Sequence, residues 1–286
     1  MLREDRQDEE PASAGNGGER HDRRGIQSIE VGGTLLQALV RHGAPMMLKD
    51  LARAAGMPPA KAHPYLVSFG KLGLIEQDPV TGRYGLGRFS LQMGLTALHG
   101  LDPLKEATPE IARLADEVDL NIAIAVWGNH GPTIVRIEEC SKQIHVNMRP
   151  GTVMTPLMLS ATGRVFATFL PARVIDPLVE EELARYTASP QPALRLSRRY
   201  VDEIIAEVRE HGLARAVSNP IPGINAFSAP VLDSSGNIAL AITAMGPASA
   251  CDPDWNGATA RKVKACAERV SARLGSVPPT GGTERD

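Results

Sequence analysis

The chain is poor in cysteine and contains no long hydrophobic run, and both absences narrow its class. Its 286 residues hold three widely spaced cysteines and no C-x-x-C pair. This usage fits neither a disulfide framework nor a cysteine zinc site. No apolar run approaches the ~20 residues that a membrane-spanning helix needs, and the charged start MLREDRQDEE is unlike a signal peptide. We therefore expect a cytoplasmic protein with reduced thiols and no membrane partner.

Sequence patterns typical of catalysis and metal binding are also missing. The seven histidines are scattered, and none forms an H-x-x-x-H or H-E-x-x-H pair. The stretch Ser160-Ala161-Thr162-Gly163 differs from the G-x-S-x-G nucleophile elbow. The glycine pairs lack the strand-to-helix context of nucleotide-binding loops. We expect no enzyme activity, no metal ion and no cofactor.

Positive charge is concentrated in one part of a chain whose net charge is −2. Residues 25–90 contain seven Lys and Arg against four Asp and Glu, whereas the residues before and after them carry a negative excess. A basic segment of this kind is typical of nucleic-acid binding. Because the excess is modest, we expect DNA affinity to depend on two copies of the domain.

The stretch from Leu48 to Gly87 predicts a helix-turn-helix. Apolar residues at helical spacing predict a first helix over 48–55, and Gly56 suits its left-handed C-terminal cap. Pro58 and Pro59 suit the first turn of a second helix, whose apolar face runs from Ala62 to Phe69 and which ends at Gly73. The small side chains of Ala52 and Gly56 predict a close crossing of the two helices at the turn.

Two short β-capable runs follow the second helix. Residues 74–77 and 83–86 flank a turn-rich connection at 78–82, which predicts a hairpin. A hairpin directly after a helix-turn-helix is a wing. The alternative is an ordinary helical hairpin with an incidental β-turn.

The rest of the chain divides around this segment. Residues 1–25 are polar, charged and aperiodic, and we expect a disordered tail. We expect a winged helix-turn-helix domain at 26–88 with a supporting helix at its start, a linker helix at 89–102, a second domain at 103–275 and a loose tail at 276–286.

The second domain combines helical and strand patterns. Helices are predicted at 103–118, 160–170, 197–212 and 254–274, and strands at 121–127, 133–137, 144–148, 226–232 and 238–243. The strands form hairpins around the turns at 128–132 and 233–237. We therefore predict an α+β domain with an antiparallel sheet.

The ordered chain resembles the IclR family of bacterial transcriptional regulators from about residue 26 to 274. In the first domain the matching segments are Ile26–Glu30, Leu51–Pro58, His63, Leu72–Ile75, Gly82–Tyr84 and Leu86-Gly87. In the second they are Arg149–Gly151, Pro156-Leu157, Ala161–Arg164, Gly212-Leu213, Pro222–Ala226, Ala229–Val231 and Gly246-Pro247.

The resemblance implies an α+β protein of two domains. The N-terminal domain would be a winged helix-turn-helix, and the C-terminal effector domain would have a GAF-like antiparallel sheet with helices. Members of the family are usually dimers through their DNA-binding domains and often tetramers through their effector domains. They repress or activate genes for the uptake or breakdown of small organic compounds. The expected partners are a double-stranded DNA operator, a small organic acid effector, and further copies of the chain in a homodimer or homotetramer.

DNA contacts are expected from the second helix, because its exposed face lies in the major groove, and from cations near it that meet phosphates. The candidates are Lys49, Pro59, Ala60, Lys61, His63, Pro64, Ser68, Lys71, Arg83 and Arg88. For each cation alone, a solvated surface charge is an equal alternative, and His63 would equally support the helix from its side.

Pro64 departs from the family pattern, in which arginine is usual at this position. A proline inside a helix loses the bond to the carbonyl four residues earlier and costs on the order of 3 kcal/mol. The helix is therefore expected either to begin late, at Pro64, or to bend there. We also expect Pro64→Arg to tighten DNA binding.

Effector contacts are expected at the start of the helix predicted at 160–170, because its free N–H groups form a site for a carboxylate. In relatives this segment and the facing strands bind effector. The matching positions are Ala161, Thr162, Gly163, Ser218, Asn219, Asn225, Ala226, Thr243 and Met245. Relatives that bind small keto acids carry acidic or hydroxyl groups where this chain has Ala226 and Met245, which favours a larger, more apolar and aromatic acid. Small residues that merely pack a helix on a sheet are the alternative.

The sequence therefore favours a ligand-responsive transcription factor. A metabolite-binding or interaction module whose sequence-specific DNA binding is impaired by Pro64 is the second interpretation, and a small-molecule enzyme is the third. Sequence-specific binding that depends on Lys61 and the wing separates the first from the second. Turnover without DNA would identify the third.

Overall fold

The computed structural model describes residues 25–140, 148–191 and 194–276. The chain divides into two compact units, Met1–Ala97 and Leu98–Asp286. The tails expected at 1–25 and 276–286 lie outside the described residues except for Gly25 and Ser276. The strand expected at 144–148 also lies outside them except for Met148, which is not in a strand.

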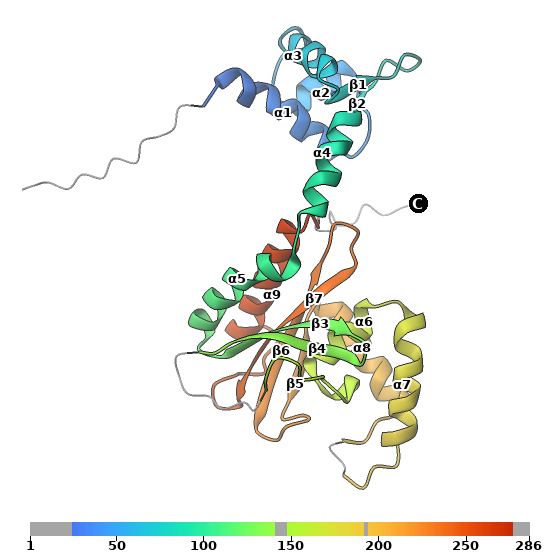
Figure 1. Cartoon of the computed structure of the whole chain (residues 1–286), viewed down its shortest axis with the longest axis vertical. Helices are drawn as coiled ribbons and strands as arrows, with labels where there is room; N and C mark the ends of the chain where they lie inside the picture. Colours follow the sequence, from blue (N-terminus) through green and yellow to red (C-terminus); the bar gives the residue numbers. More distant parts are fainter. Residues whose placement is uncertain (1–24, 141–147, 192–193, 277–286) are drawn as a thin grey trace, which may run out of the picture. The chain divides into compact units, whose positions relative to one another are not determined.

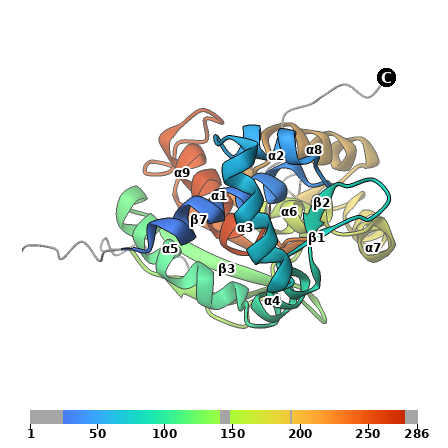
Figure 2. The same cartoon turned by 90° about the horizontal axis from the view of Figure 1, so that it is seen from above.

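Unit 1 is a winged helix-turn-helix (Figure 1). It contains α1 (Gln27–His42), α2 (Leu48–Ala54), α3 (Pro59–Lys71) and the antiparallel hairpin of β1 (Ile75–Gln77) and β2 (Tyr84–Leu86), and α4 (Arg88–His99) follows. The backbone of Met46 pairs with Tyr84, which joins the hairpin to the chain between α1 and α2. The turn of the wing projects beyond the three helices (Figures 1 and 2). The buried side chains of its core are Leu35, Ala38, Leu39, Met46, Leu51, Ala52, Ala62, Leu66, Ile75 and Tyr84.

The turn between α2 and α3 needs glycine because of its backbone conformation. Gly56 has φ +69°, a region that side chains disfavour, whereas a Cβ added there would meet no atom within 4 Å. The prediction that a small residue at Gly56 permits a close crossing is therefore wrong. Ala52, which is fully buried, is the small residue at the helix contact.

Helix α3 begins at Pro59 and runs without interruption through Pro64. The prediction that it begins late, at Pro64, is wrong. Pro58 occupies the N-cap position in an extended conformation, and Pro59 starts the first turn, where a missing N–H costs nothing. Pro64 lies beyond this turn and cannot donate to the carbonyl of Ala60.

Unit 2 is built on one five-stranded antiparallel sheet with the strand order β4-β3-β7-β6-β5. The strands are β3 (Asn121–Gly128), β4 (Gly131–Glu138), β5 (Ala214–Val217), β6 (Ile224–Leu232) and β7 (Ile238–Pro247). The helices are α5 (Pro103–Val118), α6 (Ala161–Phe169), α7 (Ala172–Tyr186), α8 (Arg198–His211) and α9 (Ala258–Arg273), with the 3-10 turn η1 at Leu157–Leu159.

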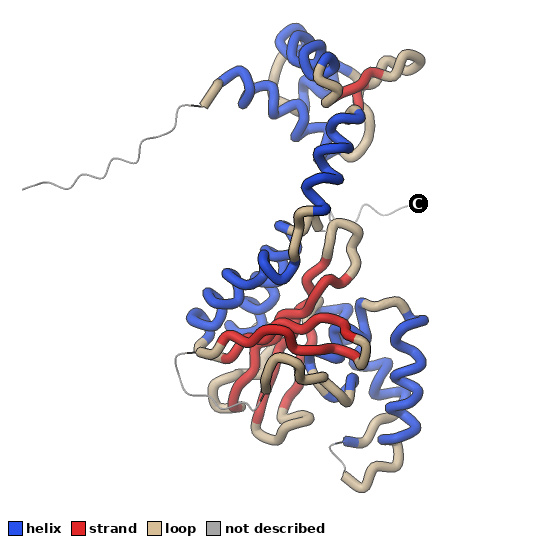
Figure 3. Tube along the Cα trace, viewed as in Figure 1, coloured by secondary structure: helices blue, strands red, loops and turns tan. Residues whose placement is uncertain are grey.

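Helices cover both faces of this sheet (Figures 1 and 3). On one face, α5 and α9 pack on side chains that include Ile122, Phe227 and Ile242. On the other, η1, α6, α7 and α8 pack on side chains that include Ala123 and Ala241. Neighbouring strand residues alternate between the two faces, so each strand contributes to both cores.

The predicted two-domain α+β fold and the antiparallel sheet with helices are confirmed. Three elements are additional to the prediction: η1, α7 and the short edge strand β5. None of the described helices has the length and apolar character required to span a membrane.

Candidate functional site

One face of α3 is buried and the opposite face is free for a partner. Ala62 and Leu66 are almost completely buried in the core of unit 1. With about 100° of rotation per residue, the helix directs Ala60, Pro64 and Val67 to the opposite side, and all three are exposed. Every α3 residue predicted to contact DNA is exposed: Pro59, Ala60, Lys61, His63, Pro64, Ser68 and Lys71.

The structure adds two observations to the predicted set on α3. Val67 is 44% exposed and lies among the predicted residues, although it was not predicted as a contact. Its position one turn beyond Pro64 was the signal that would have identified it. The Ser68 hydroxyl donates to the carbonyl oxygen of Pro64 at 3.0 Å, so part of its hydrogen-bonding capacity is used within the helix.

The turn of the wing is held by one carboxylate. Asp78 accepts the backbone N–H groups of Val80 and Thr81 at 2.7 and 2.8 Å, and these bonds lower the pKa of Asp78 below its usual value. Arg83 emerges from this ordered turn and is exposed.

Unit 1 presents four cations, predicted as phosphate contacts, on α2, α3, the wing and α4. Lys49, Lys71, Arg83 and Arg88 are all exposed, as a phosphate contact requires. Arg53, by contrast, forms an ion pair with Asp50 at 2.6 Å.

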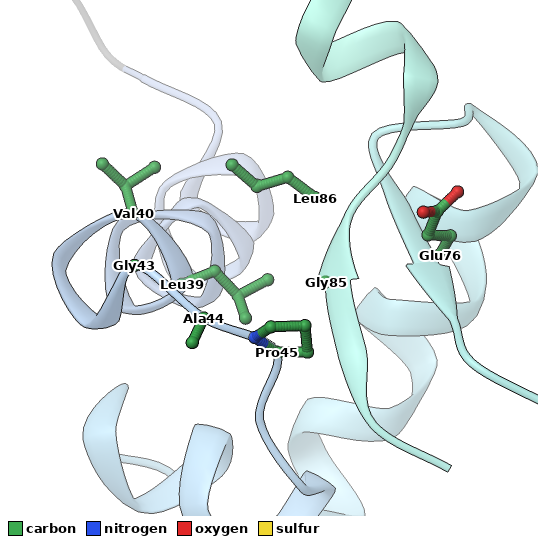
Figure 4. Close-up of a pocket in the computed structure, with 8 residues that line it drawn as sticks. All are labelled: Leu39, Val40, Gly43, Ala44, Pro45, Glu76, Gly85 and Leu86. Carbon is green, nitrogen blue, oxygen red and sulfur yellow. The ribbon is translucent and has the colours of Figure 1, made fainter. Parts of the chain in front are cut away.

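Another part of unit 1 is apolar. A hollow of about 320 Å³ lies between the C-terminal end of α1 and β2, and Figure 4 shows Leu39 and Val40 on one side of it and Gly85 and Leu86 on the other. Glu76 is the only charged residue in its lining. Large apolar side chains are also exposed on α1 and α4, namely Ile29 and Val40 on α1 and Phe89, Leu91, Met93 and Leu95 on α4.

In unit 2, a small cavity of about 50 Å³ lies between the start of α6 and strands β5, β6 and β7. Six of the predicted effector residues line it: Ala161, Thr162, Asn219, Ala226, Thr243 and Met245. Strand register explains part of this grouping, because Ala226 pairs with Ala216 on one side and with Met245 on the other. The remaining lining residues are Met148, Met154, Ser160, Ala216, Pro220, Ile221 and Ile224.

Buried hydroxyl groups join α6 to the sheet at this cavity. The hydroxyls of Thr162 and Thr243 lie 2.8 Å apart, and Thr243 is 2.8 Å from the hydroxyl of Ser228. All three residues are buried. Thr162 and Thr243 line the cavity, so one wall carries hydroxyl groups that are already hydrogen-bonded to one another.

The N-terminal end of α6 offers further donors. Ser160 caps the helix by accepting the N–H of Gly163 at 3.0 Å. The first N–H groups of a helix have no acceptor within it, so those of Ala161 and Thr162 remain for another acceptor. Both residues line the cavity.

Asn219 adds an unsatisfied acceptor to the same cavity. Its side-chain oxygen Oδ1 is buried and has no hydrogen-bond partner among the described residues. A buried carbonyl oxygen without a donor costs roughly 1–3 kcal/mol. The cavity therefore holds an acceptor that a bound molecule or a water would satisfy.

Three predicted effector residues do not line the cavity and have structural roles. A Cβ on Gly163 would lie 2.0 Å from the carbonyl oxygen of Leu157, so this glycine permits close packing of α6 on η1. Asn225 accepts the N–H of Ser218 at 3.1 Å and donates to the carbonyl of Cys251 at 2.7 Å. Ser218 has φ +48° and an exposed side chain.

Arg164 anchors the start of α6 through buried hydrogen bonds. Its buried guanidinium donates to the carbonyls of Met158 and Arg215 and to the Tyr200 hydroxyl. Burial lowers the pKa of Arg164 from its usual value. These bonds tie η1, β5 and α8 to the helix that forms the cavity wall.

A wider hollow of about 500 Å³ lies beside α7, but its charged groups are already engaged. Glu182 accepts the N–H groups of Leu157 and Met158, and Arg185 pairs with Glu181 at 2.7 Å. Burial raises the pKa of Glu182. The smaller cavity is the better candidate for an effector because it contains a buried acceptor, Asn219 Oδ1, that has no partner among the described residues.

Within the described residues, no three His, Cys, Asp or Glu side chains gather as a metal site would require. All three cysteines are buried, and burial raises the pKa of Cys251 and of Cys266 to about 11. Such thiols are poorly ionised at neutral pH and are weak nucleophiles.

Comparison with known proteins identifies both units. Residues 28–79 match the family model for the IclR helix-turn-helix domain, and residues 95–272 match the model for the bacterial transcriptional regulator IclR C-terminal domain. The chain is similar to the HTH-type transcriptional repressor AllR of Klebsiella pneumoniae, with 25% identity over 89% of this chain and 92% of that protein. It is 28% identical to the glycerol operon regulatory protein of Streptomyces griseus over 88% of this chain and 98% of that one.

Among solved structures, Pseudomonas aeruginosa HmgR is similar over 90% of this chain and all of that chain, with 36% identity and a TM-score of 0.81. A putative regulator from Silicibacter sp. has 20% identity and a TM-score of 0.75, which supports the fold. The chain belongs to the IclR family of bacterial transcriptional regulators.

Proposed function

We propose that this regulator binds a DNA operator through unit 1 and that a small organic acid in the cavity of unit 2 controls this binding. Aromatic acids are the favoured subclass. The observation that carries the proposal is the cavity at the start of α6. There the first N–H groups of the helix can receive a carboxylate, the buried oxygen of Asn219 can accept from a donor group on the same molecule, and methionines and isoleucines form much of the remaining lining.

The proposal that unit 1 binds DNA rests on α3 and on the exposed cations of the same unit. Lys61 is placed to contact a base edge or a phosphate, and Lys49, Lys71, Arg83 and Arg88 are placed to contact phosphates. These residues remain candidates individually, since a solvated cation has the same exposure.

The acid is favoured by the electrostatics of a helix N-terminus. Free N–H groups and the positive end of the helix dipole attract a carboxylate. The methionines and isoleucines of the lining, Met148, Met154, Met245, Ile221 and Ile224, favour an apolar body on that acid.

The size of the cavity explains how a ligand would act as a switch. Typical ligand pockets measure about 300–1,000 Å³, whereas this one measures about 50 Å³. An effector must therefore select a conformation with a wider cavity. Its differential affinity for the two conformations is what would shift DNA binding.

Self-association is part of the proposal. The apolar side chains exposed on α1 and α4 favour burial against a second copy of the chain, as a homodimer or within a homotetramer. Two copies would also present two recognition helices and so read two half-sites. The protein would act in the cytoplasm, where bacterial DNA lies.

Fluorescence anisotropy of the full chain against DNA fragments from beside its own gene tests this function. The titrations are repeated over a salt series, with random DNA as control. A fragment bound far more tightly than random DNA would support a sequence-specific regulator and provide the assay for screening aromatic and aliphatic acids. Weak and equally salt-dependent binding to every fragment would contradict it and favour a metabolite-binding module with impaired DNA recognition.

A further inference from the structure

The recognition helix lacks most side chains that read bases through paired hydrogen bonds. Its sequence, PAKAHPYLVSFGK, contains no Arg, Asn, Gln, Asp or Glu. Bidentate contacts to guanine and adenine come chiefly from Arg, Lys, Asn and Gln, and contacts to cytosine come from acids. Only Lys61 and Lys71 of α3 belong to this set.

The centre of the exposed face is apolar. Ala60, Pro64 and Val67 follow one another at spacings of four and three residues, so they form a single row along the helix. This row lies opposite the buried pair Ala62 and Leu66, and all three members are exposed. It therefore lies where a helix in the major groove comes closest to the bases, with Lys61 and Ser68 on one flank and His63 on the other.

In the major groove, the apolar group that distinguishes one base pair from another is the C5-methyl group of thymine. We propose that the row of Ala60, Pro64 and Val67 reads thymine methyl groups, so that each operator half-site carries thymines beneath it. The proposal rests on the DNA binding proposed above and names the sequence feature that this binding recognises.

The charge of unit 1 supports DNA as the partner of this row, because residues 25–90 contain seven Lys and Arg against four Asp and Glu. The exposed cations Lys49, Lys71, Arg83 and Arg88 would anchor the helix through phosphates while the row contacts base edges.

The full chain can be used both to find the operator and to test whether thymine methyl groups are read. The full chain is used to select duplexes from a randomised pool at fixed salt, and the enriched site is then synthesised with deoxyuridine replacing thymidine at one position at a time. Deoxyuridine keeps every hydrogen-bonding group of thymidine and removes only the methyl. We expect thymines within each half-site and a loss of affinity of about fourfold at two or three of them, the value for burial of one methyl group.

Variants assign the effect to the row. In Val67→Ala, the penalty for deoxyuridine should fall to near one at one thymine position and stay unchanged at the others. Val217→Ala is the matched control, because Val217 is 47% exposed and lies on β5 in unit 2. It should leave every deoxyuridine penalty as in the unchanged chain.

Three results would overturn the proposal. A specific site bound equally well with thymidine or deoxyuridine throughout would remove the thymine readout but leave the regulator function intact. Penalties that persist unchanged in Val67→Ala and in Pro64→Ala would assign the methyl contacts to other residues. A pool with no enriched sequence would contradict sequence-specific DNA binding itself, and the readout with it.

Discussion

At the scale of single residues, Pro64 both weakens the helix that contains it and lies on the face proposed to contact DNA. It lies inside a continuous helix, exposed at the centre of the face opposite the core. The helix tolerates the lost backbone bond because Leu66 and Ala62 anchor it in the core on either side of this position. Tertiary packing thus outweighs a local cost of roughly 3 kcal/mol.

Pro64→Arg should tighten DNA binding by roughly tenfold, because it restores the backbone donor and adds a cation that contacts guanine or phosphate. The logarithmic dependence of affinity on salt should steepen by about one unit for the added phosphate contact. Anisotropy on the selected operator and on random DNA measures both. Val217→Arg adds the same charge in unit 2 and should change neither. Unchanged or weaker binding by Pro64→Arg would contradict the added cation contact at this position, whereas the thymine contacts of the row are tested separately by the deoxyuridine series.

The two asparagines near the effector cavity should behave in opposite ways. Asn225 bonds Ser218 and Cys251, so Asn225→Ala should destabilise the fold by roughly 2 kcal/mol. Asn219→Ala removes a buried oxygen that has no partner among the described residues, so stability should stay within about 0.5 kcal/mol or rise. Midpoints of urea unfolding compare the two.

The two variants should rank in the opposite order when effector affinity is measured in place of stability. For an acid identified by the operator assay, Asn219→Ala should weaken binding, whereas Asn225→Ala should affect it only as far as the fold is perturbed. A large loss of stability in Asn219→Ala would mean that its oxygen is satisfied within the protein, which would remove one support for the ligand site.

At the scale of elements, a single buried carboxylate joins the two helices on one face of the sheet. Glu110 of α5 is 1% exposed and contacts Arg113, Arg269 at 3.1 Å and Arg273 at 2.8 Å. Burial acts to raise the pKa of Glu110, but the hydrogen bonds and charges of these arginines outweigh it and lower the pKa below its usual value. The ionised form is therefore favoured by folding.

Glu110→Gln should lower the free energy of unfolding by roughly 1–3 kcal/mol at pH 7, since the arginines lose their shared partner but remain half exposed to solvent. A lowered pKa in the folded state gives stability that is complete above the unfolded pKa near 4.5 and is lost as pH falls through the folded value. The gap between the two proteins should thus be constant from pH 8 to about pH 5 and should close below pH 4.5.

Thermal unfolding across this pH range measures the gap. Glu106→Gln is the control, because Glu106 is partly exposed and lies 3.7 Å from Arg273, and it should cost less than about 1 kcal/mol. A gap that does not depend on pH would mean that the shape of the glutamate, not its charge, joins α5 to α9.

Elements with a strong local signal were predictable from the sequence, and those without one were not. The winged domain has glycine and proline at its boundaries and regular apolar spacing, so its helices and hairpin could be placed closely. Strand β5 has only four residues, and Ala214 and Ala216 have little strand preference, so the turn at Asn219-Pro220 and Pro222-Gly223 had no recognisable strand on its N-terminal side. Helix α7 begins after Pro171, contains Pro177 and buries only Ile175 and Val179, which leaves little periodicity to detect.

The residues of the cavity could likewise be predicted only in part from the sequence. The start of α6 and the residues on β6 and β7 could be named, because a family pattern and a helix N-terminus indicate them. The sequence could not show which of these residues line the cavity and which have structural roles, because that depends on the direction of each side chain. Met148, Met154 and Ile221 reach the cavity from loops, where no periodicity relates sequence to direction.

At the scale of the whole molecule, the proposed function requires that two units separated along the chain influence one another. Unit 1 carries the recognition helix, and the described residues that line the cavity all belong to unit 2. Coupling must therefore come from a conformational equilibrium that both ligands bias. The narrowness of the cavity favours this, because an effector larger than about 50 Å³ would require a conformation with a wider cavity.

Such coupling is reciprocal, which gives a quantitative prediction. If a saturating acid changes the Kd for the operator by a factor between about 5 and 150, the usual range for allosteric proteins, saturating operator must change the Kd for the acid by the same factor. Anisotropy with and without the acid gives the first factor, and calorimetric titration of the acid into free protein and into the complex gives the second. Asn219→Ala should weaken the acid in both titrations, while operator binding without acid stays unchanged. If the acid alters operator affinity but the operator leaves the measured acid affinity unaltered, the acid site seen by calorimetry is not the site coupled to DNA, because linkage holds for any coupled pair of sites. If Asn219→Ala weakens that measured acid binding, the cavity in unit 2 is then not the controlling site.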